Sequence, residues 1–254
     1  MRMYDVNPEN EMVILLIHPM LATGKLLQEL LAEPMGKEYR YLIPDLSGHG
    51  EEITRTYESA KSEAEQIKLY MEQQGISKIK LAFGASLGAV VLMELLQKQE
   101  VQIEHLFFEG VSMFENANIL TGILKKKFLG KHMKSQKNPV YTIEKMGELY
   151  GERAKKTMAE HLMNITEESL QNIIYDCGHV HLPKLSEEQQ KKCVFAFGDK
   201  DKNLLIAKKK IKKHYPEAEL RVWPDCGHCM RLTKNPEGYA KMLKAEIADY
   251  CNLN

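Results

Sequence analysis

The sequence has no excess of charge of either sign. Its 254 residues include 35 basic and 35 acidic side chains, so the formal net charge is zero, and 44% of the residues are hydrophobic. A dedicated nucleic-acid-binding protein normally carries a clear basic excess, and an acidic disordered chain carries a large negative charge. The composition therefore argues against both classes. It is typical of a globular protein, and the length fits one large domain or a core with an insertion.

Long apolar runs are also missing. The longest run near the start, residues 12–17, has six residues, whereas a membrane-spanning helix needs roughly 18. Residues 1–20 show none of the basic leader, longer apolar stretch and small-residue cleavage site of a secretory signal. The five cysteines are an odd number, which favours reduced thiols over disulfides. We therefore expect no membrane span and a cytoplasmic location.

Short apolar segments alternate with longer amphipathic segments along most of the chain, without internal repeats. We predict strands at residues 12–17, 39–43, 78–83, 103–108, 193–197 and 219–223. We predict helices at residues 22–32, 59–74, 87–97, 204–214 and 236–250. Pro44 is expected to end the second strand. Strands that alternate with helices of this length indicate an α/β fold, with a mainly parallel sheet flanked by helices.

The alternation is interrupted between about residues 113 and 187. This interval contains four helical patterns and no strand pattern, at residues 119–128, 142–149, 152–163 and 167–175. It is too long for an ordinary loop in a compact domain. We therefore expect a helical cap at residues 113–187, inserted into a core that comprises residues 1–112 and 188–254.

A serine lies where a predicted strand meets a predicted helix. Residues 84–88 read Gly-Ala-Ser-Leu-Gly, a G-x-S-x-G motif centred on Ser86. Such a motif occurs by chance at simple turns, but between a strand and a helix it is typical of a nucleophilic serine. A hydroxyl becomes a good nucleophile only when a base removes its proton.

Candidate bases and acids follow two later strands. His228 ends the sequence Asp-Cys-Gly-His directly after the strand at residues 219–223, and Asp199 and Asp201 follow the strand at residues 193–197. The carboxyl ends of parallel strands lie at one edge of the sheet, so we expect these side chains close to Ser86. Their order is nucleophile, acid, histidine.

With these motifs the sequence resembles the α/β-hydrolase family, and in particular its cap-bearing serine hydrolases and esterases. His18-Pro19-Met20 is similar to the family's His-Gly-x loop, and residues 45–50 match its D-x-x-G-H-G loop. The resemblance covers nearly the whole chain. Because the family's acid stands three residues after a glycine, it selects Asp201; Asp199 and Glu109 remain alternatives. With few residues before the first predicted strand, the family's leading strand pair must be shortened or absent.

The resemblance implies a role for each residue. Ser86 would attack an acyl carbonyl, His228 would accept its proton, and Asp201 would orient and stabilise the imidazole. The backbone N–H groups of Met20 and Leu87 would form the oxyanion hole. Pro19 replaces the usual glycine of the family but leaves the N–H of the next residue in place.

Other histidines and cysteines are interpreted as structural. We expect His18, His49 and His105 to pack or to hold loops. Asp-Cys-Gly-His occurs twice, at residues 176–179 and 225–228, which raises the alternative of zinc bound by Cys177, His179, His181, Cys226 and Cys229. Coordination would compete with the proposed role of His228, so we expect no metal, and the implied chemistry needs no cofactor.

The predicted cap carries a run of basic residues. Six lysines and no acid lie within residues 121–140, namely Lys125, Lys126, Lys127, Lys131, Lys134 and Lys137. A solvated lysine face explains such a run. The alternative is that this edge attracts an anionic substrate, such as an acyl-CoA thioester, or an anionic surface.

The expected function is hydrolysis of a carboxylic ester or thioester of a small acyl substrate through an acyl-serine intermediate. The same fold also supports C–C bond hydrolases, lyases and acyltransferases. A catalytically silent protein that binds a small ligand under the cap is the alternative from another class. A peroxidase-like activity has no specific residue in its support.

Overall fold

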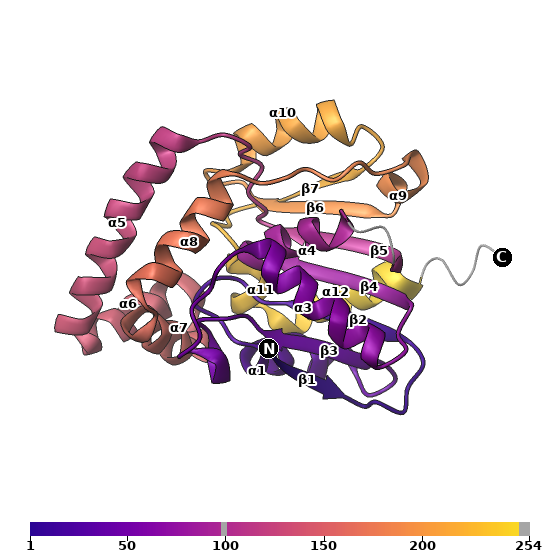
Figure 1. Cartoon of the computed structure of the whole chain (residues 1–254), viewed down its shortest axis with the longest axis horizontal. Helices are drawn as coiled ribbons and strands as arrows, with labels where there is room; N and C mark the ends of the chain where they lie inside the picture. Colours follow the sequence, from indigo (N-terminus) through magenta and orange to yellow (C-terminus); the bar gives the residue numbers. More distant parts are fainter. Residues whose placement is uncertain (98–100, 249–254) are drawn as a thin grey trace.

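The computed structural model describes residues 1–97 and 101–248, which form an α/β fold around a seven-stranded sheet (Figure 1). The strand order is β1-β3-β2-β4-β5-β6-β7. The strands are β1 (Arg2–Val6), β2 (Val13–Ile17), β3 (Arg40–Asp45), β4 (Lys78–Ala85), β5 (Gln102–Glu109), β6 (Cys193–Gly198) and β7 (Glu219–Trp223). Only β1 pairs in the antiparallel sense; the other neighbours are parallel. The predicted fold class is confirmed.

Helices cover both faces of this sheet, which is why β2 and β6 are buried along their whole length and carry no charged residue. Leu15 and Ile17 of β2 pack with α3 (Ala60–Gln73), α4 (Leu87–Leu96) and α10 (Leu204–His214). Ile14 and Leu16 point to the other face, toward α12 (Pro236–Ala248) and the helical segment after β2. That segment consists of α1 (Gly24–Leu27), a π-helical turn η1 (Gln28–Ala32) and α2 (Glu33–Met35).

Three details differ from the predictions. Strand β1 was not predicted; it is a single edge strand that pairs with β3. Strand β3 continues through Pro44, which has no N–H to donate. This is tolerated because β2 pairs with β3 only as far as Leu42. The antiparallel partner β1 does not need an N–H from every residue of β3. The helix predicted at residues 22–32 contains the π-helical turn. The predicted end of the last helix, and Cys251, lie outside the described residues.

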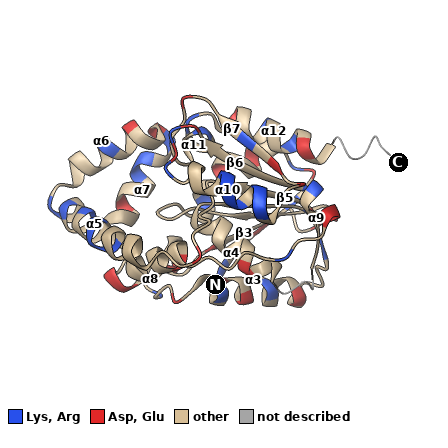
Figure 2. Ribbon diagram, turned by 90° about the horizontal axis from the view of Figure 1, so that it is seen from above, with Lys and Arg blue, Asp and Glu red and all other residues tan. Residues whose placement is uncertain are grey.

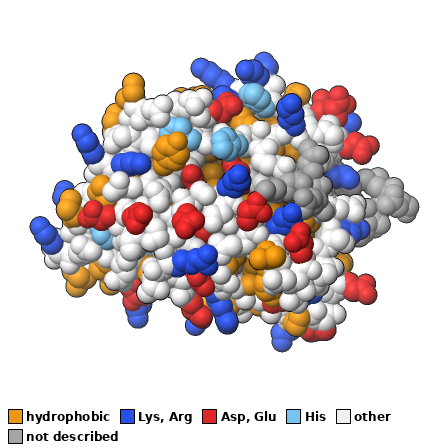
Figure 3. All heavy atoms as spheres, viewed as in Figure 1, with side chains coloured by type: hydrophobic (Ala, Val, Ile, Leu, Met, Phe, Trp, Pro, Cys, Tyr) orange, Lys and Arg blue, Asp and Glu red, His pale blue; other side chains and the backbone are white. Residues whose placement is uncertain are grey.

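The segment between β5 and β6 is helical, as its sequence pattern predicts. It contains α5 (Asn118–Lys137), α6 (Pro139–Tyr150), α7 (Glu152–Asn164) and α8 (Glu167–Gly178), which lie to one side of the sheet in Figure 2. We call residues 113–187 the cap; α9 (Glu187–Lys191) straddles its expected end. Across residues 1–97 and 101–248, no helix is both long and apolar enough to cross a membrane. Acidic and basic side chains are interspersed on the face in Figure 3.

Candidate active site

The turn between β4 and α4 holds Ser86 in a strained conformation. Its backbone has φ 49° and ψ −108°, a region that non-glycine residues rarely adopt and that is found at functional sites. The flanking glycines are required by space, because a Cβ on Gly84 would collide with the backbone of α4 and one on Gly88 with the carbonyl of Ile17. The N–H of Ser86 donates to the carbonyl of Glu109 at 2.8 Å. The turn is therefore fixed by both neighbouring strands.

His228 and Asp201 lie next to this serine, as predicted. The distance from His228 Nε2 to Ser86 Oγ is 2.8 Å, and from His228 Nδ1 to Asp201 Oδ2 it is 2.7 Å. Asp201 is buried, and its second oxygen accepts from the N–H of Asn203 at 2.9 Å. The three side chains thus form one continuous hydrogen-bonded chain, with Nδ1–H donating to the carboxylate and Nε2 left to accept from the hydroxyl.

The two alternative acids have other partners. The carboxylate of Asp199 accepts from the N–H groups of Asp225 and Cys226 and so holds the loop that carries His228. Glu109 lies at the end of β5, where Oε2 accepts from Trp223 Nε1 at 3.0 Å and from the Tyr239 hydroxyl at 2.7 Å. Neither carboxylate is hydrogen-bonded to His228, so of the three candidate acids Asp201 is the one that contacts the imidazole.

The pKa of His228 reflects opposing influences. Burial lowers it, whereas the neighbouring Cys229 and the hydrogen-bonded Asp201 carboxylate raise it, and the result is a pKa well above the ordinary value of 6.5. The carboxylate stabilises the imidazolium form. This environment suits a histidine that must become charged during a reaction.

The backbone of Gly110 lies directly against the imidazole ring of His228. Its backbone has φ 61°, and a Cβ at this position would lie 3.0 Å from His228 Cε1 and 3.0 Å from Cys229 Sγ. Cys229 itself is buried with φ 54°. The ring therefore rests directly on the backbone that follows β5. This role was not predicted from the sequence, and its only signal was a glycine directly after the Glu109 strand end.

Glu109 is an unusual neighbour for this site. Its side chain is fully buried, and burial, against the bonds from Trp223 and Tyr239, raises its pKa to about 7. Among the described residues its Oε1 has no hydrogen-bond partner. A carboxyl with a pKa near neutrality thus lies next to Gly110, whose backbone contacts the His228 ring.

The two expected oxyanion donors follow neighbouring strands. Leu87 is the first residue of α4, so its N–H has no carbonyl partner within the helix. Met20 follows β2 in a loop closed by the bond from Ala22 N–H to the Pro19 carbonyl at 3.1 Å. Gly88 packs against the carbonyls of Ile17 and His18, which brings the start of α4 against this loop. Their role as oxyanion donors stays a prediction.

His18 and His49 are buried and contact the backbone of the loops that carry them. His18 donates from Nδ1 to the Pro19 carbonyl at 2.9 Å and accepts at Nε2 from the N–H of Leu46 at 3.1 Å, so it joins the two loops that follow β2 and β3. Burial lowers its pKa to about 4, which keeps it neutral. His49 is also buried, its ring 5.0 Å from that of His18, and burial lowers its pKa as well. His105 is buried in β5, with a lowered pKa for the same reason.

The residues of the zinc alternative have other contacts. His179 Nε2 lies 2.8 Å from Asn118 Oδ1, and His181 Nδ1 lies 2.7 Å from Glu94 Oε1. Burial raises the pKa of Cys177 to about 12, so its thiol stays protonated. Within the part of the chain that the structure describes, no three His, Cys, Asp or Glu side chains gather in a way that would hold a metal ion.

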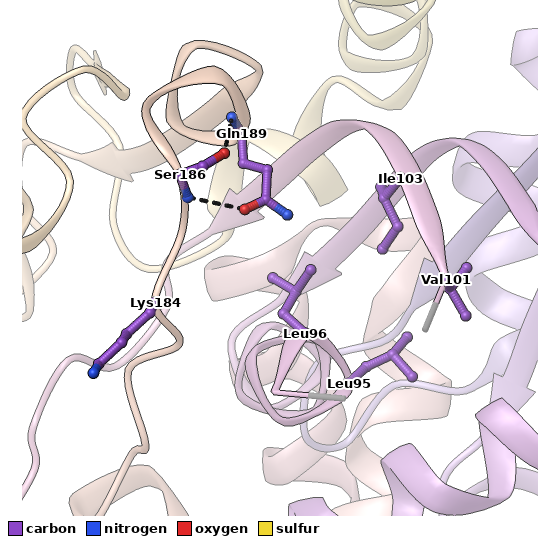
Figure 4. Close-up of a pocket in the computed structure, with 7 residues that line it drawn as sticks. All are labelled: Leu95, Leu96, Val101, Ile103, Lys184, Ser186 and Gln189. Carbon is purple, nitrogen blue, oxygen red and sulfur yellow. Dashed lines mark hydrogen bonds between the residues drawn. The ribbon is translucent and has the colours of Figure 1, made fainter. Parts of the chain in front are cut away.

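A cavity of about 300 Å³ lies at the opposite end of the sheet from Ser86 (Figure 4). It is lined by the end of α4, the start of β5 and the segment around α9, and Lys184 is the charged side chain among the described residues that line it. Among the described residues that line it there is no acid or histidine, and the hydroxyl of its one serine, Ser186, accepts from the N–H of Gln189 as a helix cap. This cavity is therefore not part of the candidate active site.

Comparisons with known proteins define the fold. No family model and no curated sequence matches the chain. An α/β hydrolase family protein from Desulfitobacterium hafniense is similar with a TM-score of 0.70 and 18% identity, covering 96% of this chain and 99% of that one. An esterase from Exiguobacterium antarcticum has a TM-score of 0.68 and 15% identity over 96% and 94%. A bromoperoxidase from Bacillus anthracis has a TM-score of 0.70 and 13% identity over 96% and 94%. The chain has the α/β-hydrolase fold, which confirms the fold predicted from its motifs.

Proposed function

We propose that the protein is a serine hydrolase that cleaves a carboxylic ester or thioester of a small acyl substrate. The observation that carries the proposal is the hydrogen-bonded chain from Ser86 through His228 to Asp201, with distances of 2.8 and 2.7 Å. The esterase among the structures of similar fold is consistent with it. Fold alone supports many chemistries, so the side-chain geometry is the stronger support.

The proposed reaction proceeds in two halves. Ser86 Oγ attacks the acyl carbonyl while His228 Nε2 takes its proton, and the N–H groups of Met20 and Leu87 stabilise the negative oxygen. His228 then gives the proton to the leaving alcohol or thiol as the C–O or C–S bond breaks, which leaves an acyl-serine ester. His228 then takes a proton from water, which attacks this ester; as the bond between the acyl carbon and Ser86 Oγ breaks, His228 returns the proton to Oγ and the acid is released. Asp201 stays ionised throughout and holds the Nδ1–H tautomer.

A fluorophosphonate probe tests whether Ser86 is an activated nucleophile. We expect the wild type to be labelled and Ser86→Ala to be spared. Ser112→Ala is the matched control, because this serine follows β5 at the same edge but donates to the Cys177 carbonyl and not to a histidine. The control should be labelled like the wild type. Absence of labelling in correctly folded wild-type protein would contradict the proposal and favour a silent binding protein.

The substrate class is tested separately, with p-nitrophenyl esters of increasing chain length assayed beside acyl-CoA thioesters. We expect turnover of at least one series, abolished by Ser86→Ala. Labelling of Ser86 without turnover in either series would argue against ester or thioester hydrolysis and for the acyltransferase or C–C bond alternatives.

A further inference from the structure

The longest cap helix, α5, carries large apolar residues on its outward side as well as on its inward side. Its buried side chains are polar, namely Thr121, His132 and Ser135. Two of these bond inside the cap: His132 Nδ1 lies 2.7 Å from the Leu162 carbonyl, and Ser135 donates to the carbonyl of His132. Large apolar residues also point outward: Ile119 is 84% exposed and Ile123 59%. Packing of the cap therefore does not explain why these positions are apolar.

The outward residues form a stripe along α5. Ile119, Ile123, Lys126, Met133 and Lys137 are separated by three, four or seven residues, so they lie on the same side of the helix. Lys127 and Lys134 flank this stripe and are exposed. The stripe continues into the start of α6, where Val140 and Tyr141 are 71% and 65% exposed. We call these nine residues the α5 face.

The charge of the α5 face is of one sign. No acid occurs from residue 116 to residue 143, and Glu115, at its border, is already paired with Lys210. Within residues 1–97 and 101–248, none of Lys126, Lys127, Lys134 and Lys137 forms an ion pair. Figure 2 shows basic segments following one another along α5 at the outer edge of the molecule. The α5 face thus combines unpaired positive charge with exposed apolar side chains.

We propose that the α5 face is a docking surface for an anionic phospholipid bilayer. Lysines beside an anionic membrane gain electrostatic attraction, while apolar side chains between them enter the boundary between headgroups and acyl chains. A nucleic acid or an acidic protein segment would satisfy the lysines, but its charged backbone or side chains would give the two isoleucines no apolar environment. The helix is held to the cap by its opposite side, so the α5 face is available without rearrangement. This inference does not depend on the proposed hydrolase activity.

Co-sedimentation with vesicles tests the proposal directly. The purified protein is mixed with vesicles of phosphatidylcholine alone or of phosphatidylcholine with 30% phosphatidylserine. We expect binding to the anionic vesicles only, weakening as salt rises from 50 to 300 mM. Because each lysine near an anionic surface contributes a factor of about five to affinity, the combined change of Lys126, Lys127, Lys134 and Lys137 to Gln should weaken binding at least tenfold.

Two control variants make the result specific. Changing Lys25, Lys37, Lys191 and Lys241 to Gln removes the same charge from exposed positions outside the cap or at its border and should weaken binding by less than threefold. Ile119→Gln with Ile123→Gln should also weaken binding at least tenfold, whereas Leu69→Gln with Leu205→Gln, which are exposed elsewhere, should not. Circular dichroism and thermal unfolding establish that each variant is folded.

Three outcomes would overturn the proposal. The first is no wild-type binding to anionic vesicles at 50 mM salt. The second is an equal loss in the two lysine variants, which would mean that charge acts without a defined surface. The third is tighter binding to duplex DNA or polyglutamate than to vesicles, unaffected by the isoleucine changes, which would assign the α5 face to a polyanion. Ser86→Ala should bind vesicles like the wild type. A failure of the membrane-docking proposal can therefore be told apart from a failure of the proposed hydrolase activity.

Discussion

A single buried carboxylate sets the behaviour of the histidine in the candidate active site. Asp201 is the acid bonded to His228, whereas Asp199, two residues away, braces the loop of that histidine. The two aspartates are chemically identical, and their different roles come from the turn after β6. That turn places one carboxylate beside the imidazole and the other beside backbone N–H groups. Substituting Asp201 and Asp199 separately distinguishes orientation of the His228 ring from support of the loop that carries His228.

Asp201→Asn should lower kcat/KM by roughly 10⁴-fold, because a neutral amide favours the wrong tautomer of His228. It should also shift the rising limb of the pH profile to lower pH. The Asp201 carboxylate raises the pKa of His228, and the histidine acts as a base only when neutral, so loss of the carboxylate lets it become neutral at lower pH. Hydrolysis of an active ester is measured from pH 5 to 9. Asp199→Asn serves as the control, and an unshifted limb in Asp201→Asn would contradict the assignment.

Glu109→Gln tests the buried carboxyl beneath His228. The unfolded glutamate loses its proton near pH 4.5, whereas burial raises the folded pKa to about 7. Between these values the folded state binds more protons, so this group makes stability fall as pH rises. The free energy of unfolding of the wild type minus that of Glu109→Gln should therefore decrease by about 3 kcal/mol from pH 4 to pH 8. Urea unfolding at both pH values measures this difference.

Glu104→Gln is the control of opposite sign. Ion pairs with Lys78 and Lys80 help to lower the pKa of Glu104 despite burial, so its contribution to stability grows as pH rises. The free energy of unfolding of the wild type minus that of Glu104→Gln should therefore increase with pH. A flat difference for Glu109→Gln would mean that burial does not raise the pKa of Glu109, so that the group loses its proton near pH 4.5 in the folded protein as it does in the unfolded chain.

The residues of the candidate site were predictable where a local motif carries them. Ser86 and His228 stand in short patterns directly after strands, and their meeting follows from the parallel sheet. The environment of Glu109 was not predictable, because its partners Trp223 and Tyr239 lie 114 and 130 positions away. Gly110 was missed for the same reason: its importance comes from the His228 ring above it, which no local pattern reveals.

At the level of elements, the loops that follow the strands position the site because their backbone lies close to its side chains, as Gly110 after β5 lies against the His228 ring. Gly110→Ala tests this, because φ 61° and the His228 ring at 3.0 Å both oppose a Cβ. We expect a loss of about 1 kcal/mol in stability from the backbone conformation and a fall in kcat/KM of roughly 10²-fold from displacement of the imidazole. Gly75→Ala is the matched control, with φ 67° and nothing within 4 Å. Equal activity loss in both variants would rule out a positioning effect of Gly110.

The elements themselves were predictable to differing degrees. Buried runs such as β2, and capped helices such as α3, where Ser59 accepts from the N–H of Ser62, carry strong local signals. Strand β1 was missed because it is a half-exposed edge strand without an apolar run. The π-helical turn after α1 was missed because one residue per turn is added without any change in the apolar pattern.

At the scale of the whole molecule, the cap is attached to the core through α8. Ser169 Oγ accepts from the N–H of Tyr57 at 2.9 Å, and Asn172 donates to the carbonyl of the same tyrosine. Asp176 accepts from the Tyr57 hydroxyl at 2.8 Å and from the N–H of Ala60, where α3 begins. The presence of a helical insertion followed from the interrupted alternation of strands and helices. Its docking did not, because these partners are more than 110 positions apart.

Asp176→Ala should loosen the cap without unfolding the core. The change leaves the Ala60 N–H and the buried Tyr57 hydroxyl without their acceptor, which costs about 1–3 kcal/mol. We expect faster amide hydrogen exchange at residues 57–62 and 167–178, while β4 and β5 exchange as in the wild type, because docking of α8 is lost before the sheet opens. Asp176→Asn keeps a carbonyl oxygen at this position and should show less than half of the effect. A uniform increase in exchange across β4 and β5 in Asp176→Ala would mean instead that cap and core unfold as one unit, and that α8 is part of the core.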